Sequence, residues 1–325
     1  MTPLDPLDNK RDRPLLVFVL GVARSGTSAL TRVLSLSGLA LPGGMLGAGK
    51  HNRRGYWEPR DSIILNSSFL ARCGSSWWDP SLRLLEDGAI DPDVRAGQVA
   101  DIVAYLKRLP AAPATVIKEL RITALSDMWF EAAELAGYDT AAVIAVRHPQ
   151  EVVASLAEAG KAPEELGSAL WLKYSLLAEK SSRGVPRVFV DYAELLDDWR
   201  RESKRISTTL AIDLNAPDER AIDDFLSPDL QHQRYSGPVE DPFSSDWMTV
   251  VYETSAAAAR DEALDTSALD RVYQEYQANE RCFRLAFEGS RGYVNSILNR
   301  LSHPALMKPV FELQAMARMR RGSWA

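Results

Sequence analysis

The stretch that decides the fold is Leu15-Leu-Val-Phe-Val-Leu20 followed by Gly21-Val-Ala-Arg-Ser-Gly26-Thr27-Ser28. The first six residues are all apolar and rich in branched and aromatic side chains, which is typical of a strand buried on both faces of a parallel sheet. From Thr27 to about Gly38, apolar side chains recur at the i, i+3, i+4 spacing of an amphipathic helix, at Leu30, Val33 and Leu34. The sequence therefore predicts a strand, a tight glycine loop and a helix in direct succession.

The alternation of strand and helix continues along the chain. Further apolar runs predict strands at residues 114–117, 141–146 and 185–190. Helices are predicted at residues 63–72, 94–108, 151–159, 166–181, 193–210, 266–287 and 304–320. Residues 40–62 are rich in Gly, Pro and basic residues, and residues 213–265 in Asp, Pro and Ser, so both segments are predicted to be irregular. The β-α-β order predicts an α/β protein: a three-layer P-loop-like fold with a central, mostly parallel sheet flanked by helices.

Length and composition limit the class of protein. The chain has 325 residues, of which 46% are hydrophobic and 25% charged, as in ordinary soluble globular proteins. This excludes intrinsic disorder, a collagen-like repeat and a small disulfide-stapled scaffold. We see no repeat or low-complexity linker, so we expect one domain over residues 1–290, with its α/β core at roughly 15–240, and a helical extension over residues 291–325.

Charge is distributed unevenly between these parts. The extension has six basic residues and one acidic residue, a formal charge of +5, while the net charge of the whole chain is −6, which leaves −11 for the rest. Because an acidic surface repels phosphate backbones, we expect no nucleic-acid partner. We interpret the extension as a solvated terminal helix, with peripheral contact to an anionic membrane surface through this helix as the alternative.

Localisation is predicted from the cysteines and from the first strand. The two cysteines, Cys73 and Cys282, have neither the spacing of a zinc site nor the number that a disulfide framework needs. Buried free thiols in a reducing compartment are the expectation. The apolar run from Leu15 to Ala23 is far too short to span a bilayer. We therefore predict a cytoplasmic protein.

The Gly21–Ser28 loop has the properties of an anion site. It nearly fits the phosphate-loop pattern G-x-x-x-x-G-K-[ST]. Its two glycines allow unusual backbone angles and close approach, and amides at the start of the following helix favour an anion. Thr27 stands where the lysine of nucleoside-triphosphate enzymes would bind the β- and γ-phosphates. The loop is therefore better suited to one terminal phosphate, with hydroxyl donors and Arg24 beside it.

The segment Arg24-Ser25-Gly26-Thr27-Ser28 resembles the 5′-phosphosulfate-binding loop of sulfotransferases that use 3′-phosphoadenosine 5′-phosphosulfate (PAPS). A second motif supports this resemblance. The strand at 141–146 runs into Arg147, and Ser155 follows eight residues later, the spacing of the family's 3′-phosphate site. Arg147 leaves the sheet at its carboxyl edge, where α/β proteins bind ligands, and Ser155 lies about two helical turns beyond it. Together they can hold a dianion with charge-assisted hydrogen bonds.

The resemblance implies a function as well as a fold. It covers roughly residues 15–240 and is closest to bacterial sulfotransferases that act on glycans, glycolipids or secondary metabolites. It implies that Arg24, Ser25, Gly26, Thr27, Ser28, Arg147 and Ser155 bind PAPS and its product, 3′-phosphoadenosine 5′-phosphate (PAP). The acceptor would be the hydroxyl group of a small molecule or carbohydrate. Sulfuryl transfer, like phosphoryl transfer, needs in-line geometry, neutralised charge and a general base.

The usual base of this family is missing. Cytosolic sulfotransferases have a Lys-x-His motif, but the corresponding segment here is Lys118-Glu119-Leu120, with leucine in place of histidine. Glu58 is the candidate base, because Glu58 and Arg60 resemble the Glu-x-Arg of tyrosylprotein sulfotransferases. The neighbouring Tyr56, Trp57 and Pro59 would restrict the loop and partly desolvate this carboxylate. Glu119 and His51 are the rival bases.

Lys118 and Arg24 are expected to stabilise the sulfuryl group and the leaving phosphate, with Glu58 as the third catalytic residue. The sequence contains no metal-ligand cluster, and this chemistry needs none when lysine and arginine neutralise the charge. Three tryptophans are candidates for stacking on a sugar or another flat acceptor, although aromatic residues more often pack in a core: Trp57, Trp77 and Trp78.

Two other classes of function remain open at this point. The first is a P-loop NTPase or small-molecule kinase, in which Asp191 at the end of a strand would share Mg²⁺ with Ser28. The missing loop lysine is the main argument against it. The second is a non-catalytic, nucleotide-binding partner protein.

Overall fold

The computed structural model describes residues 12–50, 52–160, 162–226 and 235–294. The chain divides into two compact units, Met1–Tyr273 and Gln274–Ala325. Of the second unit, the structure describes the segment from Gln274 to Val294, which is helical and exposes Phe283, Leu285 and Phe287. The sheet and all the site residues discussed below belong to the first unit.

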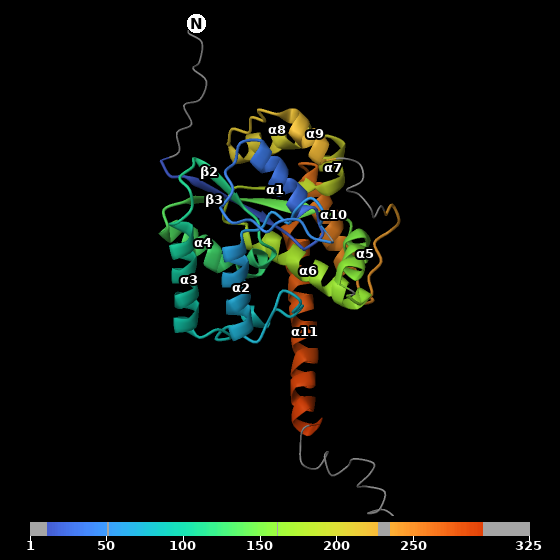
Figure 1. Ribbon diagram of the computed structural model, residues 1–325. Coiled ribbons are helices and arrows are strands. Elements are labelled where there is room, and N and C mark those ends of the chain that lie inside the picture. Colours follow the sequence, from blue (N-terminus) through green and yellow to red (C-terminus); the bar gives the residue numbers. More distant parts are fainter. Residues whose placement is uncertain (1–11, 51, 161, 227–234, 295–325) are drawn as a thin grey trace, which may run out of the picture. The chain divides into compact units, whose positions relative to one another are not determined.

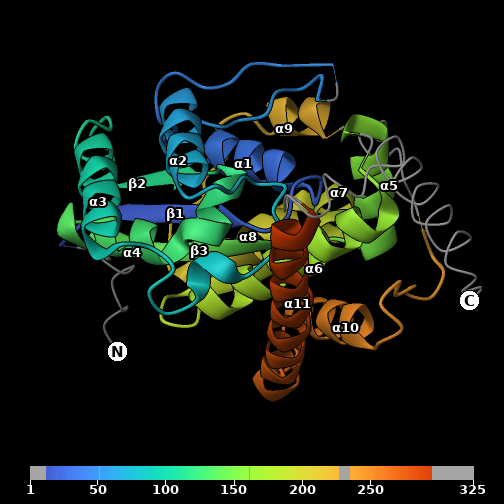
Figure 2. The same ribbon diagram turned by 90° about the horizontal axis from the view of Figure 1, so that it is seen from below.

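Four strands form one fully parallel sheet in the order β2-β1-β3-β4. Their bounds are β1 Leu15–Leu20, β2 Ala114–Ile117, β3 Asp139–Val146 and β4 Arg187–Asp191. Figure 2 views the sheet from one face, with β2, β1 and β3 side by side. The chain moves from β1 to β2 on one side and then crosses to β3 on the other, so the strand order reverses between β1 and β3.

Helices cover both faces of this sheet. Their bounds are α1 Thr27–Leu36, α2 Arg60–Arg72, α3 Pro92–Leu106, α4 Ser126–Leu135, α5 Pro149–Gly160, α6 Glu164–Ser181, α7 Tyr192–Asp197, α8 Trp199–Leu210, α9 Glu219–Phe225, α10 Trp247–Ala259 and α11 Thr266–Val294. Two short 3₁₀ helices, η1 Arg83–Leu85 and η2 Leu120–Leu125, lie between them. Figure 1 shows α1 and α8 on one side of the sheet and α4 and α6 on the other.

The alternation of side chains along β1 explains the three layers. Leu15, Val17 and Val19 pack with residues of α1, α7, α8 and α9, whereas Leu16, Phe18 and Leu20 pack with residues of α2, α3, α4, α6 and α10. All six side chains are buried, because both faces of a parallel sheet are covered by the connecting helices. The predicted α/β three-layer fold is therefore confirmed, and all four strands lie within two residues of their predicted positions.

The predicted helices need three corrections. The helix expected at 193–210 is two helices, because Asp198 ends α7 and caps α8 by accepting a hydrogen bond from the Arg201 amide. The segment 213–265 is not irregular throughout, since α9 and α10 lie within it. Asp218 caps α9 by accepting a hydrogen bond from the Ala221 amide. The sequence analysis also missed α4, a short helix whose buried side chains include the small Ala132 and Ala133.

The remaining predictions concern the two cysteines and contact with a membrane. Both cysteines are free, but Cys282 is exposed and Cys73 only half-buried, so the predicted burial of both thiols was wrong. Within the described ranges, we find no helix with the length and apolar character needed to cross a bilayer. The predicted helix at 304–320 and its contact with a membrane lie outside the described residues.

The buried position of β1 leads to a test by substitution. Replacing Leu16 with alanine should lower the free energy of unfolding by about 2–5 kcal/mol, because the side chain is fully buried and leaves a cavity. Denaturant titration followed by circular dichroism measures this change. Leu135→Ala in α4 is the control, because Leu135 is exposed and its loss should change stability by less than about 0.5 kcal/mol. Equal losses for both variants would contradict the assignment of Leu16 to the core.

Candidate active site

The Gly21–Ser28 loop follows β1 directly and leads into α1. Three of its residues have positive φ: Gly21 at 133°, Arg24 at 73° and Gly26 at 90°. Gly26 is the N-cap of α1 and provides no side-chain cap. Among the described residues, no acceptor pairs with the amides of Gly26, Thr27 or Ser28. Uncapped amides at a helix N-terminus are a site where anions bind favourably.

Ser25 and Gly21 hold the loop in shape from within. The buried Ser25 hydroxyl donates a 2.7 Å hydrogen bond to the Val22 carbonyl, so its side chain folds back into the loop. The Gly21 amide donates to Thr123 Oγ1 at 3.1 Å, which ties the start of the loop to η2. Of the predicted anion-binding residues in this loop, Ser25 is thus the one whose hydroxyl contacts the loop's own backbone.

The second motif lies directly beside the loop. Arg147 follows β3, and its Nη1 donates a 2.8 Å hydrogen bond to the Arg24 carbonyl. Arg24 Nε in turn donates to Ser155 Oγ at 2.9 Å. Ser155 lies on α5, so three segments that are far apart in sequence meet at one point. The structure therefore brings together the residues that the sequence assigned to the two ends of one donor molecule.

Arg147 is held in position by an ion pair with Glu151. The Arg147 Nε donates a 2.8 Å hydrogen bond to Glu151 Oε2, four residues later on α5. The other oxygen of Glu151 accepts a 2.9 Å hydrogen bond from the Tyr235 amide. The Tyr192 ring lies 5.0 Å from the Arg147 guanidinium carbon, the distance of a cation–π contact. The sequence analysis missed both Glu151 and Tyr192. The i, i+4 spacing of Arg147 and Glu151 was a signal that could have found Glu151.

Two guanidinium groups lie close together here, that of the buried Arg147 and that of the half-buried Arg24, and their repulsion favours binding of a negative charge. Burial lowers the pKa of Arg24, and the positive charge of Arg147 lowers it further. Arginine nevertheless stays protonated in proteins. A bound anion would relieve this repulsion, which is the electrostatic signature expected of a phosphate site.

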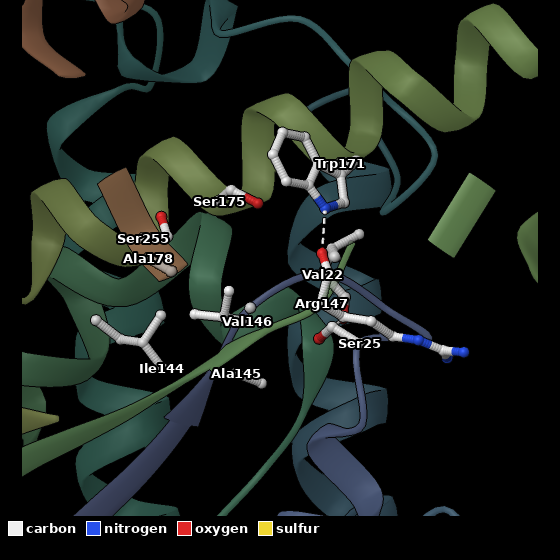
Figure 3. Close-up of a pocket in the computed structure, with 11 residues that line it drawn as sticks. Val22, Ser25, Ile144, Ala145, Val146, Arg147, Trp171, Ser175, Ala178 and Ser255 are labelled. Atoms are coloured by element: carbon white, nitrogen blue, oxygen red, sulfur yellow. Dashed lines mark hydrogen bonds between the residues drawn. The ribbon is translucent and has the colours of Figure 1, made fainter. Parts of the chain in front are cut away.

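A small pocket lies behind Arg147 (Figure 3). Its volume is about 10 Å³, which leaves room for about one water molecule, so it does not hold an organic ligand. The Trp171 indole donates a 3.3 Å hydrogen bond to the Arg147 carbonyl beside it. Figure 3 shows the Arg147 side chain pointing away from this pocket. Trp171 is itself buried and packs in the core.

A much larger cavity lies on the other side of the loop. Its volume is about 740 Å³, which is within the usual range for sites of organic ligands. It is lined by seven arginine or lysine residues and two glutamates among the residues that the structure describes. The predicted site residues that line it are Arg24, Gly26, Thr27, Ser28, Glu58, Lys118, Arg147 and Ser155.

Lys118 and Glu58 form a buried ion pair in this cavity. Lys118 Nζ lies 2.5 Å from Glu58 Oε1, and each side chain is only 6% exposed. Lys118 Nζ also lies 3.4 Å from both Ser28 Oγ and the Tyr56 carbonyl. Since Lys118 follows β2 and Glu58 precedes α2, the pair joins these segments to the start of α1. A cation and a carboxylate thus lie next to the predicted phosphate loop.

The rival base Glu119 faces the protein interior. Its side chain is 0% exposed, and it accepts hydrogen bonds from the Arg121 amide at 3.2 Å and from Asn66 Nδ2 at 2.6 Å. Burial raises the pKa of Glu119, the charge of Arg121 opposes this, and the charge of Glu58 adds to it. Glu119 does not line the cavity, whereas Leu120, which stands in place of the family's histidine, does. His51 lies outside the described residues.

Asp191, the metal ligand of the kinase alternative, has another role in the structure. Its Oδ1 accepts hydrogen bonds from the amides of Ala193 at 2.8 Å and Glu194 at 3.3 Å, so it caps α7. It does not line the cavity in which Ser28 lies. Among the described residues, we find no cluster of three His, Cys, Asp or Glu side chains suited to a metal ion.

The fold and the site define an α/β protein with a cation-lined ligand cavity where neighbouring parallel strands end. No protein-family model matches the chain, and no curated protein matches it. In structure, the chain is similar to the sulfotransferase domain from the Synechococcus PCC 7002 olefin synthase, with 20% identity and a TM-score of 0.41 over 82% of this chain and 96% of that one. It is also similar to the sulfotransferase domain from the curacin biosynthetic pathway, with 15% identity and a TM-score of 0.35 over 81% of this chain and 97% of that one. Neither likeness is close enough to assign an activity to this chain.

The position of Gly26 predicts a strict need for glycine. A Cβ atom at Gly26 would lie 2.2 Å from Cδ2 of Tyr192, and the φ of 90° is unfavourable for any side chain. Gly26→Ala should therefore lower the free energy of unfolding by about 1–3 kcal/mol. Thermal and denaturant unfolding measure this change. Gly43→Ala is the matched control, because a Cβ atom there meets nothing within 4 Å. A Gly26→Ala variant as stable as Gly43→Ala would contradict the described loop.

Proposed function

We propose that this protein is a PAPS-dependent sulfotransferase that transfers a sulfuryl group to a hydroxyl acceptor, a small molecule or a carbohydrate. One observation carries the proposal. Arg24 from the first motif and Arg147 with Ser155 from the second contact each other and line a single cavity. Two anion sites in one cavity suit a donor with a phosphate at each end.

The residues of the chain fit this donor. The amides of Gly26, Thr27 and Ser28 and the Arg24 side chain would bind the 5′-phosphosulfate, because they provide donors and positive charge at the start of α1. Arg147 and Ser155 would bind the 3′-phosphate. The excess of cationic over acidic side chains on the cavity wall suits a ligand with several negative charges. PAPS supplies the activated sulfuryl group, and the protein supplies position and charge.

Lys118 and Glu58 would perform the chemistry at the reacting end. The acceptor oxygen attacks sulfur in line with the bond from sulfur to the 5′-phosphate oxygen. As the new S–O bond forms and the old one breaks, Glu58 takes the hydroxyl proton and PAP leaves. Lys118, 2.5 Å from Glu58 and within reach of Ser28, lies where it can neutralise the charge on the sulfuryl and phosphate oxygens. No part of this scheme requires a residue from outside the cavity.

Donor binding is tested by calorimetry. The wild type should bind PAP without metal and should prefer PAP to ATP–Mg²⁺. Arg147→Gln should weaken PAP binding by about 30-fold or more, because one partner of a charged, desolvated contact is lost. Arg95→Met is the control, since Arg95 pairs with Glu131 on the protein surface. A clear preference for ATP–Mg²⁺ would favour the kinase alternative and contradict the proposal.

The role of Glu58 is tested by turnover. In a screen of acceptors with radiolabelled PAPS and mass detection of the added sulfate, Glu58→Gln should reduce kcat by a factor of about 10²–10⁴. The affinity for PAP should stay within about threefold of the wild-type value, since the base does not hold the donor. Glu158→Gln provides the same chemical change at the other glutamate on the cavity wall. Normal turnover by Glu58→Gln would exclude Glu58 as the base.

A further inference from the structure

Two tryptophans of the cavity wall have no part in donor binding as proposed above. Trp77 and Trp78 both line the cavity, and their ring centroids lie 3.7 Å apart with the planes tilted by 36°. Trp57, the third candidate from the sequence, does not line it. The Trp57 indole donates to the Arg54 carbonyl and lies against the Arg32 guanidinium. Trp77 and Trp78 therefore form an aromatic surface of two consecutive residues on the cavity wall, apart from the other aromatic residues that line it, Tyr56, Tyr192 and Phe225.

Two buried polar side chains of α6 hold the backbone of the loop that carries this aromatic surface. The Tyr174 hydroxyl donates a 3.1 Å hydrogen bond to the Trp77 carbonyl, and Lys173 Nζ donates a 2.7 Å hydrogen bond to the Asp79 carbonyl. The Asp79 carboxylate accepts a 2.9 Å hydrogen bond from the Ser81 amide. A loop braced in this way presents its tryptophans in a fixed orientation, which reduces the entropy lost when a ligand binds.

Gly160, the last residue of α5, lies against the second tryptophan. A Cβ atom at Gly160 would lie 2.7 Å from Cη2 of Trp78. The indole therefore sits close to the end of the helix that also provides Ser155. The aromatic surface and the proposed 3′-phosphate site are thus connected through α5.

Arg121 is a third group in the cavity without a role in donor binding. Its side chain is 14% exposed and lines the cavity, and its Nη1 pairs with Glu119. Within the described part of the chain, no other acceptor contacts the remaining guanidinium donors of Arg121. A guanidinium has five N–H donors, so several are left for a ligand.

A chain of buried hydrogen bonds fixes Arg121 in this position. Glu119, which holds Arg121, accepts a 2.6 Å hydrogen bond from Asn66, and Asn66 accepts a 3.0 Å hydrogen bond from the Trp129 indole. The 3₁₀ helix η2, which carries Arg121, packs against α6, whose Tyr174 donates a hydrogen bond to the Trp77 carbonyl. The arginine and the aromatic surface therefore belong to the same region of the cavity.

We propose that Trp77, Trp78 and Arg121 form the acceptor subsite, and that the acceptor is a ring-bearing hydroxyl compound with a carboxylate or a similar oxyanion. This inference rests on the proposed sulfotransferase function. The flat face of a ring stacks on the indoles, and the free donors of Arg121 bind the oxyanion. Aromatic hydroxy acids and pyranose uronic acids share this chemistry, since both combine a flat face with a carboxylate.

Calorimetry of the PAP-saturated protein tests the subsite with two pairs of probes. The first pair is 6-hydroxy-2-naphthoate and 2-naphthol, and the second is methyl β-D-glucuronide and methyl β-D-glucoside. At least one acid should bind about tenfold or more tightly than its neutral counterpart, and the pair in which this occurs identifies the kind of ring. Trp78→Ala should weaken both members of that pair, because it removes stacking and leaves the charge contact intact.

Variants of Arg121 decide whether it causes this preference. Arg121→Gln should abolish the preference for the acid. Because that change leaves Glu119 without its cation, the double variant Glu119→Gln/Arg121→Gln provides a second measurement in which no buried charge is left unpaired. Arg53→Gln is the matched control, since Arg53 is another arginine of the cavity wall, and it should keep the preference.

Three results would overturn the inference. These are equal affinity for acid and neutral probes, a preference that survives in the double variant, or no binding of any probe by a protein that binds PAP. Each leaves the donor site intact, so it contradicts the acceptor subsite alone. Failure of the wild type to bind PAP would instead contradict the sulfotransferase proposal and the subsite with it.

Discussion

The site depends on the parallel pairing of β1 with β3. Leu20 at the end of β1 lies opposite Ile144, and both strands run toward the same edge of the sheet. The strand order reverses between them, and loops at such a point diverge and leave a crevice for a ligand. The Gly21–Ser28 loop and Arg147 leave the sheet on the two sides of this crevice. A different strand order would separate Arg147 from the Arg24 carbonyl, which lies 2.8 Å from it, and would divide the cavity.

Charge in the cavity differs from charge in the whole chain. The protein is acidic, with a net charge of −6, yet cationic side chains dominate the cavity wall. Buried carboxylates hold several of these cations in place, in the pairs Arg147–Glu151, Arg121–Glu119 and Lys118–Glu58. Each pair has a cation on the cavity wall. Because a paired cation loses less conformational freedom when it binds an anion, this arrangement preorganises the cavity for a charged ligand. The cost is the desolvation of the buried charged groups.

The sequence predicted the elements whose signal is local. β1 is six consecutive apolar residues followed by a glycine loop, and its bounds agree with the prediction. α10 was missed, although it packs against β3 and β4, because it lies in a segment whose Asp, Pro and Ser content predicts irregular structure. Likewise, one predicted helix became α7 and α8, since the backbone at Asp198 is not helical, with φ −146° and ψ 81°. Composition averaged over a long window conceals such single-residue changes.

For the site, the sequence by itself determined which residues are candidates for binding anions, because the Gly21–Ser28 loop and the spacing of Arg147 and Ser155 depend on neighbours along the chain. It left the choice between Glu58 and Glu119 open. Only the tertiary structure showed that Glu58 lies in the cavity against Lys118, while Glu119 turns toward Asn66 in the interior. Lys118 and Glu119 are consecutive residues, and the backbone at Glu119 is extended, so their side chains point to opposite sides. Which of these sides is the cavity is decided by helices distant in sequence, here α2, which carries Asn66.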